Sequence, residues 1–388
     1  MPAALRLPRS PEARLVLGSL ALLLAVRAAA VLTSPLDLYA DEAQYWRWSQ
    51  HLAWGYYSKP PMIAWVIHVM TALFGDSEWS VRLAAPFLHT VAAGFVFLAG
   101  RAMFSAKTGV YAALLYALMP AVTLASGVLS TDGVLMPFWC AGLYFAWRLR
   151  SGAGLAAAAA LGLALGLGIL SKYAMLYFLI GLALACAVDA PMRRAMLSRA
   201  GAAALAVMAV VVAPHFAWNA ANDFQTVGHT VDNANLGGDL FHPENALTFL
   251  ADQMGVFGPV SFLALLAGLA GWRLNGGSDA APGRWLLCFV LPVLVFILGQ
   301  AVLSRAHANW AATAYPGAGL LLASWFARRP AVLWASLAVN ALVAVIFLVV
   351  PQLSPAQTRA LGIDNALKRT RGWDMAAEQL FAEAERTG

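Results

Sequence analysis

Long apolar runs follow one another along nearly the whole chain, and they limit what it can fold into more than any other feature. A helix of about 20 apolar residues is long enough to cross the hydrocarbon core of a bilayer. Such runs lie near 14–33, 82–104, 109–127, 134–149, 154–171, 173–190, 200–218, 251–271, 285–304, 311–327 and 331–351. Of the 388 residues, 61% are hydrophobic and 11% are charged, against about 25% charged in soluble domains. The pattern predicts an all-α polytopic membrane protein with a bundle of about eleven transmembrane helices.

The start of the chain has a second interpretation. Residues 1–35 combine a basic beginning with an apolar run, which is also the pattern of a cleaved signal peptide. The run is long enough to span a membrane, however, and many more spans follow it. We therefore interpret it as the first transmembrane helix.

The basic residues predict the orientation of the bundle. With the N-terminus inside, most Lys and Arg fall at the inner ends of the runs, as the positive-inside rule requires. The outer side carries few, namely Arg47, Lys59, Arg82, Lys172 and Arg305. Basic residues that are scattered between apolar runs argue against nucleic acid as a partner, despite the net charge of +6. Acidic residues do not set orientation, yet most of them also fall outside, which indicates an extracytoplasmic polar site.

The runs divide the chain into a transmembrane catalytic domain and a tail. The domain covers 1–351, with long outer loops at 34–81 and 219–250, and a short extracytoplasmic tail covers 352–388. Long loops of this kind are often functional. Within the first loop, 61–75 is apolar but too short to cross a bilayer, so we expect an interfacial helix there. The tail looks like a helical stub, or the opening of a larger segment that this chain does not contain.

The first outer loop carries two adjacent carboxylates, Asp41 and Glu42, among many aromatic residues. A partly desolvated carboxylate at a membrane interface can act as a general base. The alternative is a solvated turn or a helix cap by Asp41. Tyr45 and Tyr57 are candidates for stacking on a sugar, although Tyr and Trp also collect at membrane interfaces without any catalytic role.

Three cations on the outer side are candidates for binding a phosphate. Lys59 precedes two prolines that stiffen its backbone, and Lys172 and Arg305 lie at the ends of apolar runs. Charges near membrane depth are functional candidates by default. The alternative for Lys59 is a snorkelling side chain at a helix start.

Further polar residues lie on the same side of the predicted bundle. Asp132 is either a site residue or a helix cap, and a lone His such as His307 is more often structural. Neighbouring Asn309 and Trp310 offer a hydrogen-bond donor and a stacking surface. Asp41 and Glu42 could share a divalent metal ion with His229, His242 or His307. No ligand spacing supports that site, so no cofactor is predicted with certainty and the metal stays open.

The order of these motifs resembles the GT-C superfamily of integral membrane glycosyltransferases. The resemblance is to the branch of the protein O-mannosyltransferases and the lipid A aminoarabinose transferases, and it covers roughly residues 10–330. It rests on YADEAQYW, YYSKPP, SVRLAAPF, LSTDGVLMPFW, LGILSKYAML and RAHANWAATAYP, in this order and on matching sides of the membrane.

The resemblance implies a function. The donor would be a polyprenyl-phosphate-linked sugar with its phosphate on Lys59 and the other cations. Asp41 would deprotonate the acceptor hydroxyl, Glu42 would help to position the acceptor, and the sugar would be transferred with inversion. The acceptor would be lipid A, lipopolysaccharide core, another envelope glycan or a protein, on the periplasmic face of a bacterial inner membrane. Since a lipid phosphate leaving group needs charge neutralisation more than protonation, cations and one base suffice.

The chain departs from the aminoarabinose transferases at two places. They carry a glutamate, a candidate metal ligand, directly before the Lys-Pro, where this chain has Ser58. The SKPP form is more similar to bacterial enzymes that decorate lipopolysaccharide core or lipid A, including uronic acid transferases. We expect the usual C-terminal extracytoplasmic domain to be essentially absent from this chain, which then either recognises its acceptor differently or is a shortened form. A membrane transporter or a flippase for lipid-linked sugars is the alternative function, and it predicts mid-membrane charges and a repeat between halves.

Overall fold

The computed structural model describes residues 10–235, 237, 240–274 and 281–387, and this part is helical without a β-strand. The predicted domain 1–351 thus begins with nine residues outside the described part. The long helices are α1 (Pro11–Leu32), α4 (Glu78–Met103), α7 (Thr131–Arg150), α8 (Leu155–Ser171), α11 (Arg199–Ala221), α15 (Ala281–Leu303) and α17 (Pro330–Val349). The shorter elements are α2 (Ala40–Ser49), α3 (Met62–Phe74), α5 (Ala106–Ala117), α6 (Pro120–Ala125), η2 (Tyr173–Met175), α9 (Leu176–Val188), α10 (Ala190–Met196), α12 (Gln225–Asn233), α13 (Pro243–Phe257), α14 (Pro259–Leu274), η3 (Ala308–Ala314), α16 (Tyr315–Trp325), η4 (Val350–Gln352), α18 (Pro355–Ala360), η5 (Asp364–Ala366) and α19 (Trp373–Thr387).

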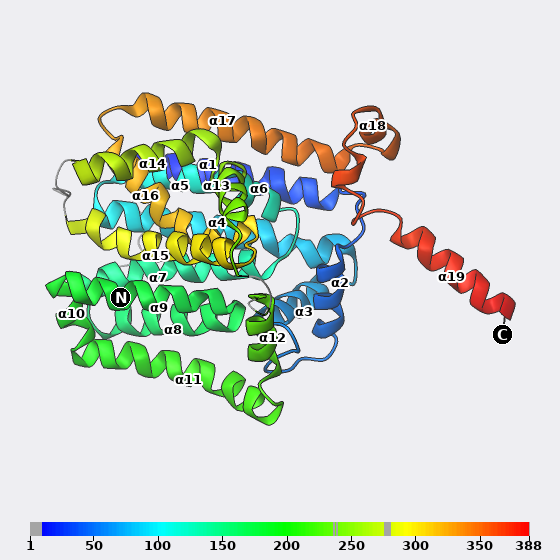
Figure 1. The fold of residues 1–388 in the computed structure, drawn as a ribbon, viewed down its shortest axis with the longest axis horizontal. Helices are drawn as coiled ribbons and strands as arrows, with labels where there is room; N and C mark the ends of the chain where they lie inside the picture. The colour runs from blue at the N-terminus through cyan, green and yellow to red at the C-terminus, as the bar shows by residue number, and fades with distance from the viewer. Residues whose placement is uncertain (1–9, 236, 238–239, 275–280, 388) are drawn as a thin grey trace.

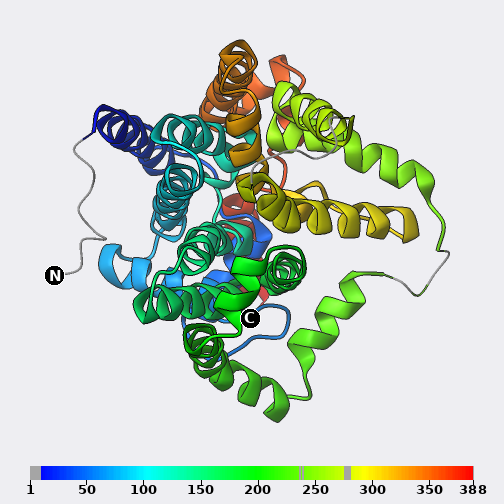
Figure 2. The same cartoon turned by 90° about the vertical axis from the view of Figure 1, so that its left-hand side faces the viewer.

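The long helices run side by side along the longest axis of the molecule (Figure 1), and Figure 2 shows many of them end-on. Helix α4 packs against α5 and α7, α7 packs against α8, and α8 packs against α11. Fully buried aromatic side chains fill the centre, where Trp139 of α7 meets Phe178 of α9 edge-on at 5.1 Å between ring centres. The all-α bundle predicted from the apolar runs is confirmed.

The predicted number of about eleven membrane spans is not confirmed. Five helices of the described part are long and apolar enough to cross a bilayer, and two bent helix pairs raise the number to seven. The predicted run 109–127 is broken, because Pro120 has no N–H to offer and pushes Met119 out of the helical region at ψ 132°. The run 251–271 is broken in the same way at Gly258 (φ 98°) and Pro259, where α13 and α14 meet at 116°.

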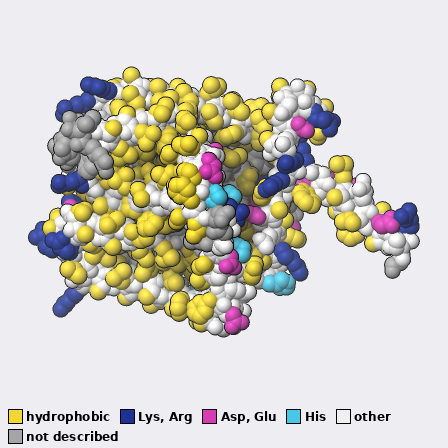
Figure 3. All heavy atoms as spheres, viewed as in Figure 1, with side chains coloured by type: hydrophobic (Ala, Val, Ile, Leu, Met, Phe, Trp, Pro, Cys, Tyr) yellow, Lys and Arg dark blue, Asp and Glu magenta, His cyan; other side chains and the backbone are white. Residues whose placement is uncertain are grey.

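The outer loops are structured. The loop 34–81 contains α2 and α3, so the expected helix at 61–75 exists, while its position against a bilayer stays a prediction. The loop 219–250 contains α12 and the start of α13, with its residues 236, 238 and 239 outside the described part. Helices α2, α3 and α12 lie toward the end from which α19 projects (Figure 1). In Figure 3, Lys and Arg gather at the opposite end, beside α10.

Candidate active site

Glu42 lies in the first turn of α2 and is fully buried, with 0% of its side chain exposed. Its carboxylate accepts hydrogen bonds from Arg82 of α4 (Nη2–Oε2 2.8 Å), from the backbone N–H of Leu129 (2.8 Å) and from the backbone N–H of Tyr39 (3.0 Å). Arg82 also donates to two carbonyl oxygens of the preceding loop. These donors enclose the oxygens of Glu42, and the expectation that Glu42 helps to position the acceptor stays a prediction. Through these hydrogen bonds, Glu42 joins α2, α4 and the start of α7.

Asp41 precedes Glu42 by one residue, and its side chain is exposed. Successive residues of a helix point about 100° apart, so one carboxylate of the pair faces the bundle and the other faces solvent. The buried ion pair of Glu42 therefore fixes the direction of Asp41. A carboxylate in the first turn is also stabilised by the helix dipole.

A second carboxylate gathers two further predicted residues. Asp132 in the first turn of α7 binds Lys172 (Nζ–Oδ1 2.7 Å) and Asn309 (Nδ2–Oδ2 2.8 Å). Ser130 caps α7 by accepting from the N–H of Gly133, and this cap holds the turn that carries Asp132. Lys172 terminates α8 in an extended conformation, which turns its side chain away from the helix axis. Three residues that are far apart in sequence thus form one cluster. The side chain of Lys172 in this cluster is 23% exposed.

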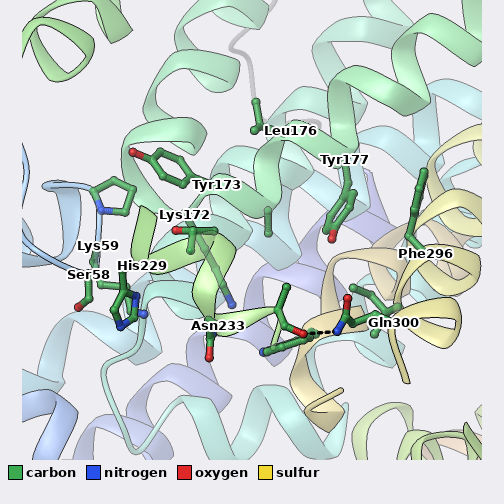
Figure 4. A pocket seen from close by; sticks show the side chains of 16 residues that line it. Ser58, Lys59, Lys172, Tyr173, Leu176, Tyr177, His229, Asn233, Phe296 and Gln300 are labelled. Atoms are coloured by element: carbon green, nitrogen blue, oxygen red, sulfur yellow. Dashed lines mark hydrogen bonds between the residues drawn. The ribbon is translucent and has the colours of Figure 1, made fainter. Parts of the chain in front are cut away.

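A cavity of about 400 Å³ opens beside this cluster. Figure 4 shows Ser58, Lys59 and His229 at one side of it, Tyr177, Phe296 and Gln300 at the other, and Lys172 and Asn233 between them. The remaining lining residues are Pro60, Tyr173, Ala174, Leu176, Thr230, Ala234, Ile297 and Trp310. The cavity is amphiphilic, because the ammonium groups of Lys59 and Lys172 and the imidazole of His229 share its lining with aromatic and aliphatic side chains. An anionic headgroup on an apolar chain fits this division.

The charges in the cavity influence one another. Burial and the neighbouring Lys172 lower the pKa of Lys59, and Asp41 and Asp132 partly oppose this shift. Burial and the charge of Lys59 also lower the pKa of His229. The cavity therefore concentrates positive charge that the two carboxylates only partly compensate. An anion bound there would relieve this repulsion and stabilise the charged form of Lys59.

The other predicted residues lie in different settings. Tyr45 is 3% exposed and packs with Ile63 and Ile67, and burial raises its pKa. Its role in stacking on a sugar stays a prediction. Tyr57 is exposed and meets the ring of His229 edge-on at 5.2 Å.

Near the end of α15, Trp310 lines the cavity, and His307 contacts it edge-on at 5.1 Å between ring centres. His307 itself is exposed. Arg305 is also exposed and is not among the lining side chains, so the structure does not bring it to the two lysines.

Several residues that line the cavity were not predicted from the sequence. Asn233 and Gln300 line it, and Gln300 donates to the carbonyl oxygen of Ala234 (2.6 Å), which ties α15 to the end of α12. His229 was considered only as a metal ligand. The sequence did mark Arg82, the partner of Glu42, as unusual, because it is one of the few cations on the outer side, where the positive-inside rule disfavours them.

The residues present do not fit the proposed metal site. In the described ranges, no three His, Cys, Asp or Glu side chains come together as ligands. The oxygens of Glu42 already accept from Arg82 and two backbone N–H groups, and Ser58 stands where the resemblance implied a glutamate. We therefore derive no step through a metal ion.

Comparison with known proteins agrees with this geometry. Residues 58–218 match the family described as dolichyl-phosphate-mannose-protein mannosyltransferase. The chain is 36% identical over 357 residues to the lipid A galacturonosyltransferase RgtD of Rhizobium johnstonii, an alignment that covers 91% of this chain and 74% of that protein.

Solved structures share the fold. ArnT of Cupriavidus metallidurans, in a crystal structure bound to undecaprenyl phosphate, superposes with a TM-score of 0.67 at 21% identity, over 87% of this chain and 64% of ArnT. The oligosaccharyltransferase of Archaeoglobus fulgidus superposes with a TM-score of 0.52 at 15% identity, over 86% of this chain and 53% of that protein. The chain thus spans less than two thirds of either solved structure.

The curated relative and the apolar helices together identify a membrane-embedded glycosyltransferase. The chain belongs to the family of the lipid A galacturonosyltransferase RgtD, within the GT-C branch that contains the protein O-mannosyltransferases, and it shares the fold of ArnT. The resemblance stated from the sequence motifs is confirmed.

Proposed function

We propose that the cavity beside Lys59 and Lys172 binds a polyprenyl-phosphate-linked sugar and that Asp41 activates the acceptor. The observation that carries this proposal is the amphiphilic lining, in which both ammonium groups share one cavity with Tyr177 and Phe296. The phosphate would lie against Lys59 and Lys172, and the first isoprene units against the aromatic side chains. Asn309 and Asp132 would hold Lys172 in place.

The reaction follows from these positions. An acceptor hydroxyl attacks the anomeric carbon from the side opposite the phosphate, and Asp41 takes its proton. The new glycosidic C–O bond forms while the bond to the phosphate oxygen breaks, so the sugar is transferred with inversion and polyprenyl phosphate leaves. Lys59 and Lys172 stabilise the negative charge that develops on this leaving group. Trp310 and Tyr57 would offer surfaces for the sugar, whereas Arg305 and His307 lie farther out.

We propose a uronic acid as the sugar and a lipid A-type glycolipid as the acceptor. The similarity to the galacturonosyltransferase of Rhizobium johnstonii supports this choice. The cavity supports it as well, because His229 beside Lys59 offers a further donor for a sugar carboxylate. The domain division at 351 and the location, a bacterial inner membrane with the site on the periplasmic face, belong to the same proposal. The basic end beside α10 would then face the cytoplasm.

The substitution Asp41→Asn tests the assignment of the base. It preserves the size of the side chain and removes its ability to take a proton, so the transfer rate should fall roughly 10²–10⁴-fold. The purified enzyme is given undecaprenyl-phosphate galacturonic acid and lipid A, and product glycolipid is measured by mass spectrometry. The melting temperature should stay that of the wild type. Unchanged turnover would remove Asp41 as the base, and wild-type enzyme that moves the lipid without forming product would favour a flippase.

A further inference from the structure

The C-terminal tail docks on the loop that leads into α2. The backbone N–H of Asp37 donates to the carbonyl oxygen of Thr370 (3.0 Å), and the N–H of Trp373 donates to the carboxylate of Asp37 (2.9 Å). Within the tail, Arg371 donates to Thr358 (2.9 Å), which closes the turn after α18. These bonds hold residues 369–373 against the first outer loop, while α19 beyond them projects away from the bundle (Figure 1).

This docking places Arg369 over the start of α2. Its Nη1 donates to the phenol oxygen of Tyr39 (2.6 Å), and its guanidinium carbon lies 5.9 Å from the centre of the Tyr39 ring. Trp373 donates through Nε1 to the backbone carbonyl of Arg369 (3.1 Å). Tyr39 is the N-cap residue of α2, two positions before Asp41. Arg369 nevertheless remains exposed, as does its neighbour Lys368.

Arg369 also interacts electrostatically with Asp41. The hydrogen bond with Tyr39, and then the charge of Asp41, raise the pKa of Arg369. The charge of Asp41 also acts to raise the pKa of Lys59, which lines the cavity. The exposed carboxylate therefore has one cation in the cavity and another on the tail. Figure 3 shows Lys and Arg side chains where the tail meets this end of the bundle.

We propose that Arg369, assisted by Lys368, binds an anionic group of the acceptor and so sets acceptor specificity. The inference rests on the proposed function, in which the donor phosphate occupies Lys59 and Lys172 and Asp41 deprotonates the acceptor. A guanidinium has five N–H donors, and the bond to Tyr39 uses one of them. The remaining planar fork matches a phosphate or a carboxylate, and both groups occur on envelope glycolipids.

The test compares acceptors that differ in charge. Enzyme in phosphatidylcholine nanodiscs, saturated with donor, receives a phosphorylated lipid A, the same lipid A without phosphates, or a dephosphorylated form that carries acidic core sugars. We expect Arg369→Gln to raise the KM for a charged acceptor about tenfold, because losing a charged hydrogen bond costs about 1.4 kcal/mol or more. The KM for the neutral acceptor should rise much less than that for the charged acceptor. The acceptor that responds shows whether phosphate or carboxylate is bound.

Control variants separate recognition from folding. Arg369→Lys keeps the charge and should recover part of the affinity, and Arg359→Gln removes an exposed arginine of α18 and should have no effect. An equal rise in KM for the neutral acceptor, an unchanged KM for both charged acceptors, or weaker donor binding in Arg369→Gln would overturn the proposal. Wild-type enzyme that transfers sugar to none of the glycolipids would instead contradict the proposed acceptor class.

Discussion

Two carboxylate–cation pairs at the same end of the bundle have almost the same nitrogen–oxygen distance but differ in how deeply they are buried. Glu42 and Arg82 are 2.8 Å apart with 0% and 3% of their side chains exposed, whereas Asp132 and Lys172 are 2.7 Å apart with 18% and 23% exposed. In the first pair the carboxylate also accepts from two backbone N–H groups. In the second pair the lysine faces a cavity that can hold an anion.

The difference shows that the distance within an ion pair does not reveal its role. A buried pair whose hydrogen bonds are all made fixes the elements that carry it, and it has no capacity left for a ligand. The partly buried pair keeps its lysine in place and leaves other N–H donors of that lysine available. We therefore assign the first pair to the framework of the site and propose that the second takes part in binding.

Removal of the buried carboxylate should have the largest effect on stability. Glu42→Ala leaves Arg82 charged and buried without its partner, so the free energy of unfolding should fall by about 3–5 kcal/mol. Thermal and denaturant unfolding in detergent measure this change. Asp41→Ala is the matched control from the same helical turn, and it should lose less than about 1 kcal/mol. Equal losses of unfolding free energy in the two variants would contradict the assignment of Glu42, but not Asp41, to the framework of the site.

Removal of the partly buried carboxylate of Asp132 should act on binding more than on stability. In Asp132→Ala, water can solvate the ammonium of Lys172, so the loss of stability should be about 1 kcal/mol. The KM for the lipid-linked donor should rise because Lys172 loses the group that orients it. Asn309→Ala keeps the ion pair and should give the smaller change of the two. A destabilisation as large as that of Glu42→Ala would place Asp132 in the framework as well.

The smallest effect concerns the pH dependence of donor binding. The pKa of Lys59 lies below its usual value, and the protonated form binds phosphate. Donor affinity should therefore be complete at neutral pH and decline as the pH rises through this lowered pKa. Titration of donor KM in the alkaline range measures the decline, and Lys59→Arg should remove it because arginine stays charged. A pH-independent KM in the wild type would contradict contact between Lys59 and the phosphate.

Short-range features of the site could be predicted from the sequence. The position of Asp41 and Glu42 after the first span, and the cations on the disfavoured side of the membrane, indicated where the polar end of the bundle would be. The same reasoning treated the two carboxylates alike, because sequence proximity does not show that Arg82 and Leu129 enclose one of them. The sequence also did not predict the contacts of the tail with Asp37 and Tyr39, which link positions more than 300 residues apart.

Apolar run length, charge asymmetry and motif order by themselves determined that this protein is a helical membrane bundle of the GT-C class. These properties follow from the composition of each segment and from the cost of placing charge in lipid. Only the tertiary structure decided which carboxylate is buried, that Asp132 gathers Lys172 and Asn309, and that Arg369 lies beside α2. Such contacts join helix ends from distant parts of the chain, and packing of the whole bundle brings those ends together.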